Sequence, residues 1–96
     1  MIVRYTRQAL GHLDEAREFI AQEHPTAALA IGQRIRQAVS GLSQFPNRGR
    51  PGRVPGTREL VITGTPFIAA YRVSGGHVDV LAILHGARQW PSAFSG

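Results

Sequence analysis

The feature that most restricts how this chain can fold is a pattern of apolar residues with helical spacing, interrupted at one point. Apolar residues recur along residues 7–24 at spacings of four, three and four, which places them on one face of a helix. These residues are Ala9, Leu13, Ala16 and Ile20. His24-Pro25 ends this pattern, because proline disfavours helical geometry in the residue before it and suits the first turn of a new helix.

A second helical stripe follows directly in residues 26–45. Its apolar members are Ala28, Ile31, Ile35, Ala38, Val39 and Leu42. Arg34 and Arg36 fall on the opposite side of this helix, where a solvent-exposed face is expected. Two amphipathic helices with so short a connection are predicted to form an antiparallel hairpin.

The second half of the chain carries three runs typical of β-strands, at residues 58–62, 67–73 and 77–85. A Thr-Gly-Thr-Pro turn separates the first two runs, and Ser-Gly-Gly joins the last two as a hairpin. Strict alternation along the last run predicts one face made of four residues. They are Val78, Val80, Ala82 and Leu84. Because the middle of this run is apolar on both faces, it is predicted to be a central, buried strand.

A short strand at residues 2–5, with Thr6 capping the next helix, completes the order β-α-α-β-β-β. Strands segregated from helices indicate an α+β fold, with the helical hairpin packed on one face of a small, mainly antiparallel sheet. A chain of 96 residues builds one core, so a single domain over residues 1–96 is expected.

Composition argues against several kinds of site. The chain has no cysteine, so neither a disulfide nor a thiolate metal site can form. The four histidines lie on different predicted elements without paired spacing, so neither a metal nor a cofactor is expected; they are His12, His24, His77 and His85. No run approaches the roughly 20 apolar residues that cross a bilayer, and no secretory signal is visible. A cytoplasmic protein without a membrane partner is therefore expected.

Positive charge is concentrated in the second half. The net charge is +5 and every basic residue is arginine. Four arginines, three glycines and two prolines crowd into Arg48–Leu60, ahead of the first strand of that half. Arg48, Arg50 and Arg53 are expected beside a sheet edge, and arginine is suited to bidentate contacts with carboxylates. The segment is therefore either a docking surface for an acidic partner or a set of turns whose arginines only maintain solubility.

Three blocks of the sequence resemble the RelE/ParE superfamily of toxins from bacterial type II toxin–antitoxin systems. The blocks are FPNRGRPGRVPGTRELVI (45–62), GTPFIAAYRV (64–73) and ILHGARQWP (83–91), and the helical segment DEAREFIAQEHPTAA fits the same pattern. The likeness covers nearly the whole chain and is greatest to the ParE branch, the plasmid stabilisation proteins. It implies a RelE/ParE-like fold, inhibition of DNA gyrase and hence of replication, and neutralisation by a small ParD-like antitoxin. RelE-like relatives instead cleave messenger RNA on the ribosome.

The nuclease alternative has an identifiable set of residues. Metal-free RNA cleavage needs a base, an acid and cations around the phosphate. Arg58, Arg72 and Arg88 are expected to cluster at one end of the sheet with His85 near them, so the alternative catalytic set is Arg72, His85 and Arg88. RelE-like nucleases usually add a tyrosine or histidine in the tail beyond the arginine that Arg88 matches. This tail offers Trp90 and Phe94, which cannot transfer protons, and Tyr71 is expected either beside Arg72 or in the core.

A protein inhibitor needs anchor residues rather than catalytic groups, and arginine and tryptophan are enriched among such anchors. The predicted partner-binding residues are Arg48, Arg50, Arg53, Arg58, Arg88 and Trp90. Trp90 would otherwise cap the core between sheet and hairpin, and Arg72 or Arg88 would otherwise pair with Glu59 or Asp79. The favoured interpretation is a non-enzymatic gyrase inhibitor; a ribosome-dependent nuclease is the alternative. A nucleic-acid-binding module is a third hypothesis, disfavoured because the seven aromatic residues lie mostly on apolar stripes.

Overall fold

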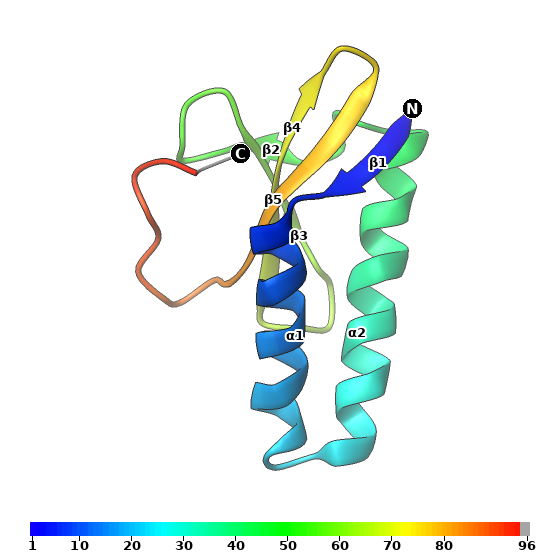
Figure 1. The fold of residues 1–96 in the computed structure, drawn as a ribbon, viewed down its shortest axis with the longest axis vertical. Coiled ribbons are helices and arrows are strands. Elements are labelled where there is room, and N and C mark those ends of the chain that lie inside the picture. Colours follow the sequence, from blue (N-terminus) through cyan, green and yellow to red (C-terminus); the bar gives the residue numbers. More distant parts are fainter. Residues whose placement is uncertain (95–96) are drawn as a thin grey trace.

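The computed structural model describes residues 1–94. In this part of the chain, five strands form a sheet in the order β1-β5-β4-β3-β2, and two helices pack on one of its faces (Figure 1). The elements in chain order are β1 (Ile2–Tyr5), α1 (Arg7–Ala21), α2 (Pro25–Ser40), the 3₁₀-helix η1 (Gly41–Ser43), β2 (Arg50–Pro51), β3 (Arg58–Val61), β4 (Phe67–Ser74) and β5 (His77–His85). The predicted α+β fold with a helical hairpin on a sheet is confirmed.

Both helices begin and face the core as their sequence patterns predict. The Thr6 hydroxyl accepts a hydrogen bond from the Ala9 amide (3.1 Å), which satisfies one of the free donors at the start of α1. Pro25 is the first residue of α2, where its missing N–H costs no hydrogen bond. The buried helix residues are Ala9, Leu13, Ala16, Ala28, Gly32, Ile35 and Val39. The hairpin therefore lays its apolar stripes on the sheet.

The sheet is mixed rather than purely antiparallel. β1 runs parallel to β5, and the helical hairpin connects β1 at one edge of the sheet to β2 at the other. The other neighbouring strands are antiparallel. Gly75 and Gly76 have positive φ angles (56° and 81°) and form the two-residue turn between β4 and β5. β2, a two-residue edge strand inside the arginine-rich segment, has no counterpart among the strands predicted from the sequence.

A β-bulge in β5 overturns the predicted alternation of that strand. Ala70 lies opposite Ala82 and the next residue, Tyr71, lies opposite Val80, so Leu81 is an extra residue. An inserted residue reverses which side chains face the core beyond it. The β5 members of the core under the helices are Val78, Val80 and Ile83. The single face predicted for Val78, Val80, Ala82 and Leu84 is therefore wrong.

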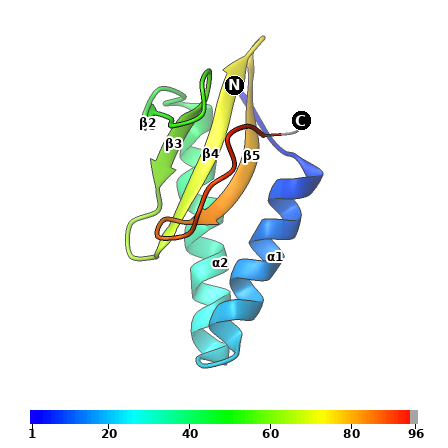
Figure 2. The same cartoon turned by 90° about the vertical axis from the view of Figure 1, so that its left-hand side faces the viewer.

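The face of the sheet away from the helices is also covered. Figure 2 shows the segment after β5, in red, crossing in front of β4 and β5, while α2 lies behind the sheet and α1 lies to the right of it. Ala70, Leu81 and Ala82, which are not part of the core under the helices, are buried as well. No helix in residues 1–94 is long and apolar enough to span a membrane.

Candidate functional site

The arginines expected at one end of the sheet lie at two opposite ends. Arg72 pairs in register with Asp79 at the start of β5, whereas Arg88 follows His85 at its end. At about 3.3 Å per residue, the strand between them spans roughly 20 Å. The predicted cluster of Arg58, Arg72 and Arg88 is wrong, because Arg58 lies opposite Tyr71, on the side of Arg72. Arg72 cannot act on the same phosphate as His85 and Arg88.

Arg50 and Arg53 both bind a buried carboxylate, while their own side chains stay 55% and 43% exposed. The Glu59 side chain is only 3% exposed and accepts four hydrogen bonds. Arg50 Nη2 donates to Oε1 (3.0 Å), while the backbone N–H (2.8 Å), Nε (3.1 Å) and Nη2 (3.2 Å) of Arg53 also donate to this carboxylate. Burial raises the pKa of Glu59, but the hydrogen bonds from Arg53 and Arg50 outweigh it, so the pKa lies below its ordinary value. The arginine-rich segment is thereby fastened to β3.

Trp90 stacks on the same segment. The Arg53 guanidinium carbon lies 3.7 Å from the centre of the Trp90 ring, and the indole N–H donates to the His85 carbonyl (3.3 Å). Phe94 meets the ring edge-on at 6.5 Å. Trp90 is thus partly buried against the loop, rather than between sheet and hairpin, and a chain of contacts Glu59–Arg53–Trp90 holds the C-terminal segment in place.

Because Trp90 is the chain's single tryptophan, its fluorescence reports on this stack. We expect Arg53→Gln to shift the emission maximum to longer wavelength, since loss of the guanidinium exposes the indole to water. Arg48→Gln, a neighbouring change with no contact to the ring, serves as the control. Identical spectra for wild type and Arg53→Gln would contradict the stack.

Tyr71 and Arg58 support the chain that leads into β2. The fully buried Tyr71 hydroxyl donates to the Pro46 carbonyl (2.6 Å) and accepts from the Gly49 N–H (2.9 Å). Arg58 Nη1 donates to the Gly49 carbonyl (2.7 Å). A Cβ on Gly49 would lie 2.7 Å from the Tyr71 ring, so only glycine fits there. Tyr71 thus lies in the core, one of the two alternatives left open for it, and its hydroxyl both donates and accepts a hydrogen bond.

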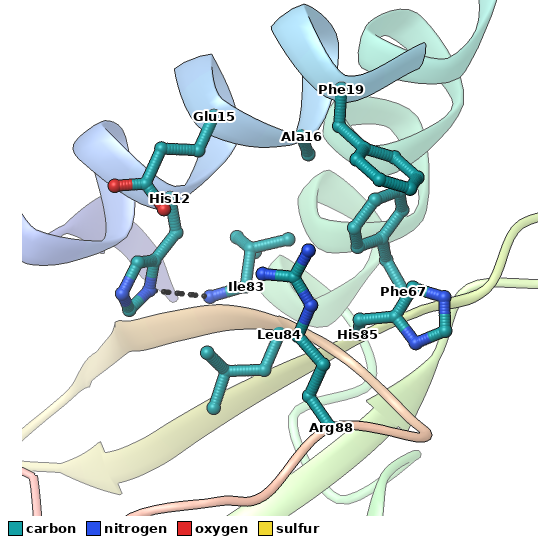
Figure 3. A pocket seen from close by; sticks show the side chains of 9 residues that line it. All are labelled: His12, Glu15, Ala16, Phe19, Phe67, Ile83, Leu84, His85 and Arg88. Carbon is teal, nitrogen blue, oxygen red and sulfur yellow. Dashed lines mark hydrogen bonds between the residues drawn. The ribbon is translucent and has the colours of Figure 1, made fainter.

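Arg88 and His85 lie beside a small pocket under α1. The pocket has a volume of about 90 Å³ and is lined from α1 by His12, Glu15, Ala16 and Phe19. Figure 3 shows the Arg88 side chain extending toward α1, and its guanidinium carbon lies 5.6 Å from the centre of the Phe19 ring. His85 reaches this side of the sheet because of the bulge at Leu81, and its ring meets Phe67 edge-on (5.8 Å).

Both histidines of this pocket are held by the backbone. His12 Nδ1 accepts from the Ile83 N–H (3.2 Å) and His85 Nδ1 accepts from the Ala87 N–H (3.1 Å). A neutral imidazole has one donor and one acceptor nitrogen, so these hydrogen bonds assign the proton of each ring to Nε2. The lone pair that a general base would need is therefore already in use on His85.

His12 and Glu15 were not among the predicted site residues. The available signal was their spacing, since positions 12, 15, 16 and 19 follow the three-and-four pattern of one helix face. Within residues 1–94, no three histidine, aspartate or glutamate side chains gather into a group that could hold a metal ion.

The remaining acidic residue of the sheet, Asp79, is bound by Arg4 from β1. Arg4 Nε donates to Asp79 Oδ1 (2.9 Å), and this hydrogen bond lowers the pKa of Asp79, with a smaller contribution from the charge of Arg72 opposite it. Arg72 lies opposite Asp79, but within residues 1–94 it forms no ion pair with Asp79 or Glu59, so the salt bridge given as its structural alternative is not found.

Residues 3–90 match the family model described as the ParE toxin of the type II toxin–antitoxin system parDE. The chain belongs to the ParE toxin family. Y4kP of Sinorhizobium fredii, named as a candidate toxin, is 43% identical to this ParE chain over 93% of the chain and 92% of Y4kP. Toxin RelE2 of Caulobacter vibrioides is 36% identical over 90% of the chain and 96% of the relative.

The ParE fold is also found in a solved structure. A chain from the chromosomal ParDE system of P. aeruginosa superposes with a TM-score of 0.82 at 36% identity, covering 86% of this chain and 92% of that chain. The resemblance to the RelE/ParE superfamily is thus confirmed. As a ParE family member, the protein is the toxin component of a type II toxin–antitoxin system, with an antitoxin as its partner. The names of the relatives include both ParE and RelE, so the choice between target inhibition and RNA cleavage has to come from the site.

Proposed function

We propose that this ParE-family toxin inhibits DNA gyrase by binding it, and that a ParD-like antitoxin neutralises it. The observation that carries the proposal is the dispersal of the acid–base groups an RNA-cleaving relative would need. Arg72 lies at the far end of β4 from His85 and Arg88, the Tyr71 hydroxyl is buried in two hydrogen bonds, and the tail offers Trp90 and Phe94. The choice of gyrase as the target rests on the resemblance to the ParE branch.

Binding requires exposed anchors, and Arg88 is the strongest of those predicted. It is exposed, follows the end of a strand, and forms no ion pair within residues 1–94. Phe19, 49% exposed, lies beside it and adds apolar surface. Together they form a cation–aromatic pair of the kind that concentrates binding energy at protein interfaces. Arg50 and Arg53 contribute indirectly, by fixing the loop and Trp90.

One observation favours the nuclease alternative. The pocket under α1 brings His12, Glu15, His85 and Arg88 together, which are the residue types of an acid–base site. With the proton of each imidazole on Nε2, this pocket can donate hydrogen bonds to a phosphate, and Glu15 is the only carboxylate among its lining residues. The alternative catalytic set Arg72, His85 and Arg88 would be replaced in that case by His85, Arg88 and Glu15.

Two parallel assays test the proposal. Purified protein is incubated with gyrase and relaxed plasmid, and separately with programmed ribosomes. We expect inhibited supercoiling with intact message, and Arg88→Gln should raise the inhibitory concentration by about ten-fold or more, as loss of an interface anchor does. Arg7→Gln removes the same charge from an exposed position and is the matched control. Cleaved message together with normal supercoiling would refute gyrase inhibition and support the nuclease.

A further inference from the structure

One hollow lies between α2 and the outer edge of β3, and a second adjoins it along the loop that follows η1. The first, about 470 Å³, is lined by Arg34, Gln37 and Ala38 of α2, by Val61 and Thr63, and by Arg48. The second, about 440 Å³, continues from Arg48 past Asn47 and Pro46 to Phe45. Because both hollows share Arg48, they form one surface, which we call the α2–β3 groove.

The backbone of β3 is open along this groove. The Ile62 N–H donates to the Phe67 carbonyl on the β4 side, and peptide groups alternate along a strand, so the N–H and C=O of Val61 point away from β4. β2 covers only Arg58 and Glu59. In the described chain no strand lies opposite Val61, which leaves a short edge that can accept another strand.

The groove is cationic and has no acidic partner of its own. No aspartate or glutamate lines either hollow. Arg48 stacks over the Phe45 ring at 4.8 Å, and Arg34 Nη1 reaches the Thr63 carbonyl only at 3.4 Å. Neither forms an ion pair within residues 1–94, whereas Glu59 and Asp79 are held by other arginines. Arg34, expected on a merely solvated helix face, thus joins Arg48 across the groove.

Apolar side chains complete the surface. Phe45 is 54% exposed and Val61 51% exposed, at the two ends of the groove. A cationic groove with apolar ends and an open strand edge complements an extended chain whose side chains alternate between carboxylates and aliphatic groups.

We propose that the α2–β3 groove binds an acidic, extended segment of the antitoxin. The segment adds a strand beside Val61, places carboxylates on Arg34 and Arg48, and packs an aliphatic side chain against Phe45. This deepens the antitoxin half of the proposed function and rests on it, but it does not depend on gyrase. It also moves the predicted docking surface from Arg50 and Arg53 to Arg48 and Arg34.

The test uses a defined probe and a matched pair of double variants. A blocked peptide of about seven residues, alternating glutamate and valine, is long enough to form one strand and is titrated into isotope-labelled protein. We expect amide shifts at Val61 and Thr63, and no binding when lysine replaces glutamate. Arg34→Gln/Arg48→Gln should weaken both the peptide and the ParD-like antitoxin by about ten-fold or more and flatten the salt dependence. Arg7→Gln/Arg36→Gln carries the same charge change at exposed helix positions outside the groove and should weaken them less than about three-fold.

Several results would overturn the groove assignment. They are equal losses in the two double variants, equal binding of the lysine peptide, or amide shifts confined to other surfaces. Unchanged antitoxin affinity in Arg34→Gln/Arg48→Gln would do so as well. Gyrase is absent from these titrations, so the two hypotheses are tested independently. A protein that does not inhibit supercoiling can still bind the antitoxin in the groove, and a protein that does not bind it there can still inhibit gyrase.

Discussion

Replacing Tyr71 by phenylalanine is expected to lower the free energy of unfolding by about 2–4 kcal/mol. The substitution keeps the ring but removes a hydroxyl that donates to the Pro46 carbonyl and accepts from the Gly49 N–H. The buried Gly49 N–H and the partly buried Pro46 carbonyl would then both lose their partner, at roughly 1–3 kcal/mol each. Chemical denaturation monitored by circular dichroism measures the loss, which corresponds to a fall in melting temperature of roughly 10 °C or more for a domain of this size.

Tyr5→Phe is the matched control. Tyr5 is only partly buried, and burial raises its pKa while Arg36 opposes that shift. Its hydroxyl lines an open hollow beside β1, so water can replace any partner it loses, and we expect a change within about 0.5 kcal/mol. If both substitutions changed stability equally, Tyr71 would not be the structural support inferred from its contacts, and its hydroxyl would again be a candidate for chemistry.

The elements of the fold could be predicted from sequence because each one has a local signal. The three-and-four spacing along α1 and α2, the break at His24-Pro25 and the glycine turn after β4 depend only on nearby residues. The ends of two elements differ from the predicted ones: α1 ends at Ala21 rather than His24, and β4 continues to Ser74 rather than ending at Val73. The parallel pairing of β1 depends on a contact between residues about 75 positions apart, for which the local pattern holds no information.

The site was harder to predict for two different reasons. The bulge at Leu81 is set by packing on both faces of β5, and it alone brings His85 under α1; strict alternation pointed it away. Likewise, nothing local shows that Arg50 and Arg53 share one buried carboxylate. The separation of Arg72 from Arg88, however, follows from the hairpin itself: Arg72 lies two residues before Ser74, where β4 ends at the turn, and Arg88 lies beyond the other end of β5. Strand direction alone therefore places Arg72 and Arg88 at opposite ends of the sheet.

Replacing Glu59 by glutamine is expected to cost about 2–3 kcal/mol at neutral pH, since hydrogen bonds to a charged group contribute roughly 1.5–3 kcal/mol. Glu59 holds Arg50 and Arg53, and through Arg53 it holds Trp90. The amide can accept only at its single oxygen and carries no charge, so the loop from Arg50 to Thr57 should loosen from β3. Unfolding free energy and Trp90 emission should therefore change together.

The pH dependence of stability distinguishes loss of the Glu59 charge from a change in local packing. The pKa of Glu59 is lowered in the folded protein, so its ionised form stabilises the fold above its unfolded pKa, near 4.5, and this contribution disappears as the pH falls through the lower folded value. Wild type should lose stability over that acid range, Glu59→Gln should lose less, and the two curves should converge at low pH. Asp79→Asn is the control, with a smaller loss because Arg4 and Asp79 are more exposed. A difference between wild type and Glu59→Gln that stays constant down to low pH would mean that glutamine disturbs packing, and that the Glu59 charge contributes nothing to holding the arginine-rich segment.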